Sequence, residues 1–245
     1  MKNTKNMEKT YKELKKFYET ISVTKLSESD KRRLKIMVEL VKDLKIKKLL
    51  DVGCIPEMTE TFVNTLKCEG VGINISKKVL RSARKTKKIK YVCADAQYLS
   101  LNEKFDLIVC GEILEHLPDV DDFIYRVKKL LNPNGYLLLT IPNLASLFNR
   151  ISLLFGWQPR GLNPSRKILL NPFTKYDYNW GHVSMFTHYS IKKFLKENGF
   201  KILKIRGTYG GHEGEGKLRK FIRWFMSLKT SFAEQLIILA QLTIS

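Results

Sequence analysis

The chain has 245 residues, of which 44% are hydrophobic, and this length and composition predict one globular domain that buries a substantial core. Its 44 lysines and arginines against 24 aspartates and glutamates give a net charge of +20. That balance favours a nucleic acid, an anionic membrane surface or a phosphorylated substrate as partner, and it also fits a solvated lysine-rich surface.

Cysteine usage and the N-terminus narrow the class further. The four cysteines form no Cys-x-x-Cys pair, so the sequence predicts reduced thiols in a cytoplasmic protein and no metal site. The lysine-rich N-terminus lacks the apolar segment of a signal peptide. No stretch approaches the roughly 18 apolar residues of a membrane-spanning helix.

Residues 1–45 are predicted to form two amphipathic helices, Glu8 to Thr20 and Ser29 to Leu44. In the second, apolar residues recur with the period of a helix that buries one face. These residues are Leu34, Met37, Val38, Val41 and Leu44.

Between residues 47 and 141, short apolar runs alternate with helical stretches. The predicted strands are Lys47–Val52, Gly70–Ile75, Ile89–Cys93, Phe105–Cys110 and Tyr136–Ile141, and the helices are Met58–Cys68, a basic helix capped by Ser76, and Asp119–Leu131. Such alternation predicts an α/β fold with a doubly wound parallel sheet. Apolar runs that end in small and acidic residues are typical of buried parallel strands with a ligand at their carboxyl ends.

After Ile141 the pattern changes. A helix over Leu144–Phe155 is followed by a long aromatic-rich loop, and we expect residues 143–187 to form a substrate-side insertion or lid. A helix over Ser190–Asn198 and a strand over Phe200–Arg206 follow. Residues 207–230 combine a glycine-rich loop with a basic amphipathic helix, which either docks on an anionic membrane or packs on the sheet. The run Glu234–Ile244 is a candidate closing strand, and no second-domain boundary is evident.

Together these segments resemble the class I S-adenosylmethionine-dependent methyltransferases, in their small-molecule branch. The resemblance covers roughly residues 30 to 206. The matching segments are 51–54, 70–76, 94–97, 112–117, 131–136, 181–187 and 198–200. It implies a seven-stranded, mostly parallel sheet whose antiparallel last strand lies between strands five and six. It also implies S-adenosylmethionine as cofactor and S-adenosylhomocysteine as product.

The resemblance implies that the cofactor lies at the tips of the first four strands. The residues concerned are Asp51, Gly53, Cys54, Asn74, Asp95, Ala96, Gln97 and Glu112. A residue without Cβ at Gly53 lets the backbone pass close to a bulky ligand. Asp51 is expected to bind the cofactor's ammonium group, Asp95 the adenine amine, and Glu112 to face the methionine portion.

Two positions depart from the family's pattern. Ile55, Pro56 and Glu57 stand where further glycines are usual, and an isoleucine with positive φ would be strained, so the loop must take another path or the pocket is altered. Asn74 replaces the expected acid at the end of strand two and loses a charge-assisted hydrogen bond. These departures keep a non-catalytic binding protein among the hypotheses.

Methyl transfer to a hydroxyl group needs positioning and a base. His116 is the first candidate base, at the ordinary histidine pKa of about 6.5; alternatively it only begins a helix. His182 is the second candidate, with Tyr178 and Trp180 shaping the acceptor site. We expect O-methylation of a sugar, a lipid-linked intermediate or a quinone-like acceptor, by a protein that is cytoplasmic or peripheral to a membrane. The alternatives are an RNA or DNA methyltransferase and the non-catalytic protein.

Overall fold

The computed structural model describes residues 16, 19, 26–84, 86–164, 168–172, 181–210 and 216–243. Within them, one seven-stranded sheet has the order β3-β2-β1-β4-β5-β7-β6. Its strands are β1 (Lys48–Val52), β2 (Glu69–Asn74), β3 (Ile89–Cys93), β4 (Phe105–Gly111), β5 (Leu131–Pro142), β6 (Phe200–Thr208) and β7 (Gln235–Leu242). Neighbouring strands from β3 to β5 are parallel, whereas β7 runs antiparallel to both β5 and β6. The predicted α/β fold, with its antiparallel closing strand, is therefore confirmed.

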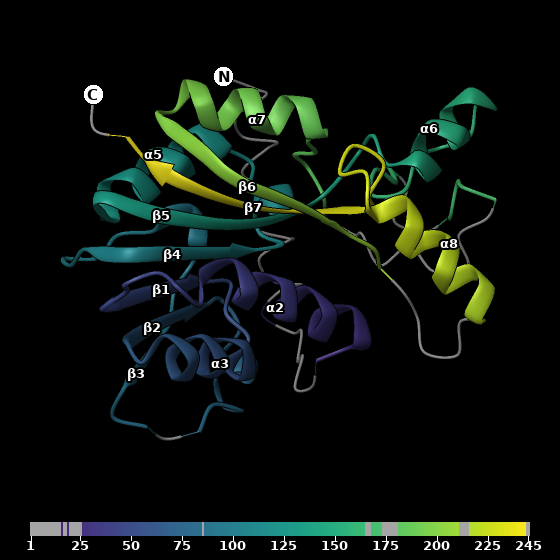
Figure 1. Ribbon diagram of the computed structural model, residues 1–245. Helices are drawn as coiled ribbons and strands as arrows, with labels where there is room; N and C mark the ends of the chain where they lie inside the picture. Colours follow the sequence, from purple (N-terminus) through teal and green to yellow (C-terminus); the bar gives the residue numbers. More distant parts are fainter. Residues whose placement is uncertain are drawn as a thin grey trace.

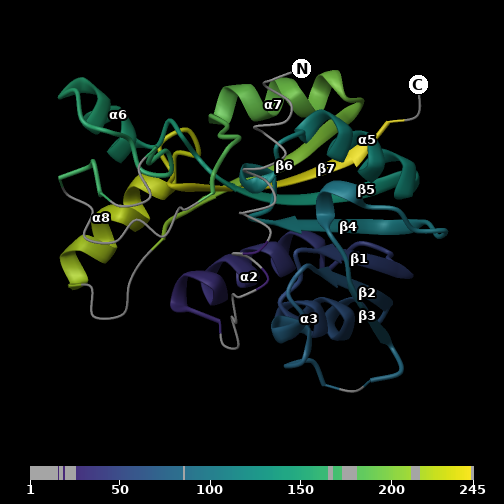
Figure 2. The same cartoon turned by 180° about the vertical axis from the view of Figure 1, so that it is seen from behind.

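The central strands are apolar because both of their faces are covered (Figures 1 and 2). In β1, Leu49 belongs to one core cluster and Leu50 to the other, as the alternation of a strand requires. The helices α2 (Glu28–Val41) and α3 (Pro56–Leu66) pack on the Leu49 side. On the Leu50 side lie α5 (Val120–Leu130) and α7 (His188–Glu197).

Several element bounds differ from the prediction. The helix α4 (Lys77–Leu80) has only one turn and buries only Val79, so the predicted basic helix after Ser76 is short. Strand β5 begins at Leu131 rather than at the predicted Tyr136; Asn134 adopts a φ of 60°, and the pairing with β4 shifts register between Leu131 and Tyr136. The short helices η1 (Ala96–Tyr98) and η2 (Leu114–His116) follow β3 and β4. The predicted helix over residues 8–20 lies outside the described ranges, apart from its two described residues.

Two helices stand apart from the layered body. They are α6 (Leu147–Leu154), which follows β5, and α8 (Lys217–Ser227), which joins β6 to β7. Both extend beyond the end of the sheet where β5 finishes and β7 begins (Figures 1 and 2). Helix α8 therefore does not pack on the sheet face. Among the described helices, none has the length and apolar character needed to cross a membrane.

Candidate cofactor and active site

A cavity of about 250 Å³ lies at the carboxyl ends of the first four strands. This edge is where open α/β sheets bind their ligands, because the strand order reverses there. Six of the predicted site residues line it, and α2 contributes one more side chain. The predicted residues are Gly53, Asn74, Asp95, Ala96, Glu112 and His116, and the α2 residue is Arg33.

The loop from β1 to α3 accommodates an isoleucine without strain. Only Gly53 adopts a positive φ, of 77°, and a Cβ there would lie 2.2 Å from Cδ1 of Ile113. Ile55 has a φ of −104° and immediately precedes α3, whose first residue is Pro56. Proline is favoured at that position because a backbone N–H there would have no partner within the helix, so its absence costs nothing. The loop thus takes the alternative path anticipated above, and the cavity remains open beside it.

Asn74 holds this loop through both ends of its amide. Its Nδ2 donates to the carbonyl of Cys54 at 2.8 Å, and its Oδ1 accepts from the backbone N–H of Ser76 at 2.8 Å. A carboxylate could make the second bond but not the first, because it has no proton to donate. The departure at Asn74 therefore has a structural reason. It also means that the side-chain carbonyl of Asn74, a predicted cofactor-binding residue, already accepts from Ser76.

Three residues predicted to bind cofactor do not line the cavity. Asp51 is buried under α3, and its carboxylate accepts from Thr59 Oγ1 at 2.6 Å. Cys54 is buried beside it. The Gln97 side chain donates to the carbonyl of Asp119 and accepts from the Asp119 N–H. Asp51, for which an ammonium-binding role was predicted, is thus bonded to Thr59 of α3 and is not among the residues that line the cavity.

Asp95 and Ala96 lie at one wall of the cavity, after β3. The Oδ1 atom of Asp95 accepts from the N–H of Gln97 at 3.0 Å and so caps η1. Its neighbours Ala94 and Ala96 are small, and Ile73 and Val79 add apolar surface nearby. This part of the lining combines one carboxylate with small and apolar side chains.

Arg33 and Glu112 form the opposite wall. Arg33 is 6% exposed and bonds Asp30 at 2.8 Å, while its second terminal nitrogen lies 3.7 Å from Glu112 Oε2. That same Glu112 oxygen accepts from Gln235 at 3.1 Å. Among the described residues, Arg33 Nε and Glu112 Oε1 are buried and have no hydrogen-bond partner. Buried polar atoms without partners are costly, so a ligand that supplies both is favoured here.

His116 and His182 meet although 66 residues separate them, with ring centroids 4.7 Å apart. The Nδ1 of His182 lies 3.1 Å from the carbonyl of Gly161, and Nε2 of His116 lies 3.9 Å from Oε1 of buried Glu115. The backbone carbonyl of Glu115 accepts from the N–H groups of Val183 and Ser184, which brings the two segments together. Ligand-type atoms of Glu115, His116 and His182 all lie within 4.8 Å of one another. The sequence predicted no metal site because such residues are not clustered along the chain, whereas the fold brings these three ligand-type side chains together.

Burial sets the protonation of this cluster. It lowers the pKa of His116 to about 4, and burial together with neighbouring His116 lowers the pKa of His182 to about 3. The ordinary value assumed for His116 from the sequence was wrong, because the sequence does not show how far the ring is desolvated. Burial, and secondarily the charge of Glu112, raises the pKa of Glu115 well above its usual range. Both imidazoles are therefore neutral at pH 7.

The sequence contains a signal for Arg33, one of the site residues that were not predicted. Arg33 falls on the same helical face as Met37 and Val41, at spacings of four and eight, so a charge stands on the buried side of α2. Glu115 lies within a segment that resembles the family, but no role was expected of it. Tyr178 and Trp180, expected to shape the acceptor site, lie outside the described residues.

Comparison with known proteins assigns this arrangement to a family. The family model described as "Methyltransferase domain" matches residues 11–205. The ubiquinone biosynthesis O-methyltransferase of Pelagibacter ubique is 33% identical over 208 residues, which cover 77% of this chain and 83% of that protein. The protein of the same name from Rickettsia typhi is 27% identical, and the match covers 56% of this chain and 61% of that relative.

A solved structure shows the same fold at lower identity. The N-methyltransferase NodS from Bradyrhizobium japonicum WM9, in complex with S-adenosylhomocysteine, aligns with a TM-score of 0.57 and 16% identity over 88% of both chains. The sheet order, the cavity at the strand tips and the family match agree. The chain belongs to the class I S-adenosylmethionine-dependent methyltransferase family.

Proposed function

We propose that this enzyme transfers a methyl group from S-adenosylmethionine to a hydroxyl oxygen of a small, quinone-like acceptor. The observation that carries the proposal is the neutral His116 in the wall of the strand-tip cavity. The names of the curated relatives, which are ubiquinone biosynthesis O-methyltransferases, support the same chemistry.

The cavity residues fit the cofactor at its amino-acid end. Its methionine portion carries an ammonium and a carboxylate. Glu112 Oε1 and Arg33 Nε are buried groups of opposite charge whose hydrogen bonds are unfilled among the described residues. Glu112 would accept from the ammonium, and Arg33 would donate to the carboxylate. Such charge-assisted bonds are about twice as strong as neutral ones.

The other wall fits the adenosine. Asp95 supplies a carboxylate for the adenine amine, and the small side chains of Ala94 and Ala96 leave a slot for the ring. Gly53 keeps space for the cofactor, because a Cβ there would collide with Ile113, which also lines the cavity. We assign no cofactor contact to Asp51, Cys54 or Gln97, because their side chains lie away from the cavity.

The bound cofactor supplies an electrophilic methyl group on a sulfonium. The chain's own residues orient the acceptor and remove its proton. Neutral His116 accepts the proton of the acceptor hydroxyl, and Glu115 lies 3.9 Å from His116 Nε2. The ring of His182 packs against His116 and fixes its orientation.

In this proposal the acceptor binds beside His116 and His182. We propose that residues 143–187 cover the acceptor, because Gly161 and residues 181–184 already bond the histidine cluster. An apolar quinone-like acceptor would reside in a membrane, so we further propose that the protein works at a membrane surface.

Calorimetry with S-adenosylhomocysteine tests the cofactor site. Arg33→Met should weaken binding at least tenfold, because it removes a buried charge-assisted donor. Lys31→Met is the matched control on the exposed side of α2 and should leave the affinity unchanged. Equal affinities for the two variants would refute the assignment of Arg33.

Turnover with a phenolic quinone-like acceptor tests the base. His116→Gln should lower kcat by roughly 10²- to 10⁴-fold while S-adenosylhomocysteine binding persists. The wild-type rate should fall only as the pH drops through about 4, since the neutral imidazole prevails above the lowered pKa of His116. A rate that already falls near pH 6.5 would contradict the buried geometry.

A further inference from the structure

The helix α6 buries polar side chains and exposes apolar ones, which is the reverse of an ordinary surface helix. Its buried side chains are the polar Asn149 and Ser152, whereas Leu154 is 80% exposed. Four apolar side chains of α6 and its C-cap are exposed: Ile151, Leu153, Leu154 and Phe155. A helix in water normally presents the opposite arrangement.

Hydrogen bonds fix this orientation. Asn149 accepts from the N–H of Arg160 at 2.8 Å and donates to its carbonyl at 3.1 Å. Asn171 donates to Ser152 Oγ at 3.2 Å and to the carbonyl of Gln158 at 2.6 Å. Rotation of α6 to bury its leucines would break these bonds, so the outward apolar face is built into the fold.

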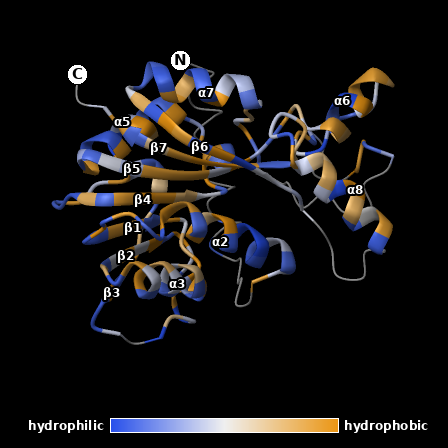
Figure 3. Ribbon diagram, in the orientation of Figure 1, coloured by the Kyte–Doolittle hydropathy of each residue, from blue (hydrophilic) through white to orange (hydrophobic). Residues whose placement is uncertain are grey.

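Helix α8 has the same character. Among its described side chains, no apolar one is buried, whereas Ser227 at its end is. Its exposed apolar side chains, with the residue that follows, are Leu218, Phe221, Ile222, Trp224, Phe225 and Leu228. Figure 3 shows hydrophobic residues along both α6 and α8 at the end of the molecule away from the layered body.

The two helices form one surface, here called the α6–α8 surface. A groove of about 610 Å³ lies between them, lined by Phe148 and Ile151 of α6 and by Leu218 and Ile222 of α8. Asn143, at the end of β5, donates to the carbonyls of Ser231 and Ala233, which ties the base of α6 to the turn after α8. The surface stands at the same edge of the sheet as the cofactor cavity, because β5 ends and β7 begins there.

The charge of these segments indicates what binds to the α6–α8 surface. In the sequence, residues 144–172 contain four lysines and arginines and no acid. Residues 216–234 contain five and one acid, Glu234, which lines the groove and pairs with Arg223. Apolar side chains flanked by basic ones suit the boundary between anionic headgroups and acyl chains. A second copy of the chain would bring two basic faces together. A nucleic acid would gain little from exposed leucines and isoleucines.

We infer that the α6–α8 surface docks the enzyme on an anionic lipid bilayer, with α6 and α8 lying in its interface. The inference deepens the proposed function, since it places the cavity beside the membrane, but it does not depend on methyl transfer. Docking and catalysis can therefore fail separately.

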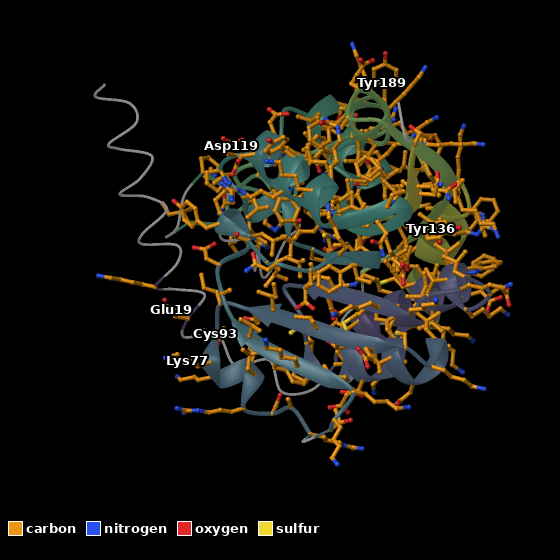
Figure 4. The ribbon with its side chains drawn as sticks, turned by 90° about the vertical axis from the view of Figure 1, so that its left-hand side faces the viewer. Glu19, Lys77, Cys93, Asp119, Tyr136 and Tyr189 are labelled. Atoms are coloured by element: carbon orange, nitrogen blue, oxygen red, sulfur yellow. The ribbon has the colours of Figure 1, made fainter. Side chains whose placement is uncertain are left out.

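Sedimentation of the full chain with lipid vesicles tests the apolar contribution. Wild type should bind phosphatidylcholine vesicles containing phosphatidylglycerol far better than phosphatidylcholine alone. The double variant Leu154→Ser, Phe225→Ser should lose roughly tenfold or more in partitioning, because two large side chains no longer leave water. The control is Tyr125→Ser, Tyr189→Ser; both tyrosines are exposed and belong to α5 and α7 rather than to the α6–α8 surface, and Figure 4 shows Tyr189 projecting at the top of the molecule.

A charge-reversal pair tests the electrostatic contribution. Lys217→Glu with Lys220→Glu should weaken binding to the anionic vesicles by more than about 25-fold, from about fivefold for each basic residue lost. Lys192→Glu with Lys193→Glu on exposed positions of α7 makes the same change in net charge and should have a much smaller effect. All four variants should keep wild-type S-adenosylhomocysteine affinity, which shows that they fold.

Three results would overturn the inference. The first is equal loss in a variant and its control, and the second is wild-type binding that ignores phosphatidylglycerol. The third is an α6–α8 surface engaged elsewhere: a dimer in sedimentation equilibrium, or RNA binding, that Leu154→Ser with Phe225→Ser abolishes. Vesicle binding that persists while His116→Gln is fully active would refute the proposed base and leave the docking intact.

Discussion

At the residue scale, Gly53 shows how much of a binding site depends on a missing atom. Its φ of 77° is one that residues with a Cβ rarely adopt, and the added carbon would lie within 2.5 Å of two Ile113 atoms. Ile113 belongs to the cavity wall, so a displaced Ile113 would fill the space that the cofactor needs.

Gly53→Ala should therefore weaken S-adenosylhomocysteine binding and also lower the unfolding temperature. Gly156→Ala is the matched control, because Gly156 has a similar φ of 71° but a Cβ there would meet nothing within 4 Å. Backbone strain alone costs of order 1 kcal/mol in both variants. If calorimetry gave both variants wild-type affinity, the close approach at Gly53 would have no role in binding.

Asp51 makes a second residue-scale prediction, about pH and stability. Burial raises the pKa of Asp51 from 3.8 to about 7, even though Thr59 bonds the carboxylate. The folded chain thus holds a proton that the unfolded chain releases, so this contribution to stability is complete below pH 3.8 and is lost as the pH rises through about 7.

Asp51→Asn should remove that dependence, because an amide cannot ionise. Urea unfolding at pH 5 and at pH 8 measures it. The difference in unfolding free energy between the two pH values should be smaller in Asp51→Asn than in wild type. An unchanged difference would show that Asp51 is ionised in the folded protein.

At the element scale, the loop from β1 to α3 depends on Asn74. Family relatives are expected to place an acid there, yet this chain uses the amide to donate to Cys54 and to accept from Ser76. The loop that replaces the glycines is therefore held by a side chain from the neighbouring strand. The Asn74 hydrogen bonds hold the loop that lacks the usual glycines. The two departures from the family's pattern, at residues 55–57 and at Asn74, therefore compensate each other.

Asn74→Asp should consequently destabilise the protein rather than restore a better site. The carboxylate faces the Cys54 carbonyl without a proton to share, at a cost of about 1–3 kcal/mol in unfolding free energy. S-adenosylhomocysteine affinity should fall as the loop loosens. Asn198→Asp loses a comparable bond to the carbonyl of Phe194 at the end of α7 and should leave that affinity unchanged. An Asn74→Asp variant that binds S-adenosylhomocysteine more tightly than wild type would contradict this role of Asn74.

Helices α6 and α8 show the limit of periodicity at this scale. Both were predicted as helices, α8 from its apolar spacing, and the structure confirms them. Periodicity reveals that a helix has two faces, but not which face meets the protein. Here the polar network of Asn149 and Ser152 decides the orientation of α6.

At the scale of the whole molecule, the charge of +20 acts on folding and docking in opposite directions. Repulsion among like charges disfavours the compact state, and salt screens it. The unfolding temperature should rise as NaCl increases from about 50 to 500 mM, while vesicle binding weakens over the same range, since the Debye length shrinks severalfold from its value of about 10 Å at 0.1 M. Circular dichroism and sedimentation on the same samples measure both. If the unfolding temperature and vesicle binding both rose, or both fell, as NaCl increased, the charge would not act on them in opposite directions.

The sequence by itself determined the sheet, the order of its elements and the strand tips at which the cofactor site forms. Buried parallel strands must be short apolar runs, and each run ends where the backbone meets its ligand, so both features are local. Only the tertiary structure decided which side chains reach the cavity. Arg33 arrives from a helix at the start of the chain, and His182 joins His116 from a segment that hydrogen-bonds Glu115. Asp51 turns toward α3, and burial sets the protonation of Asp51 and His116, because desolvation depends on neighbours that are distant in sequence.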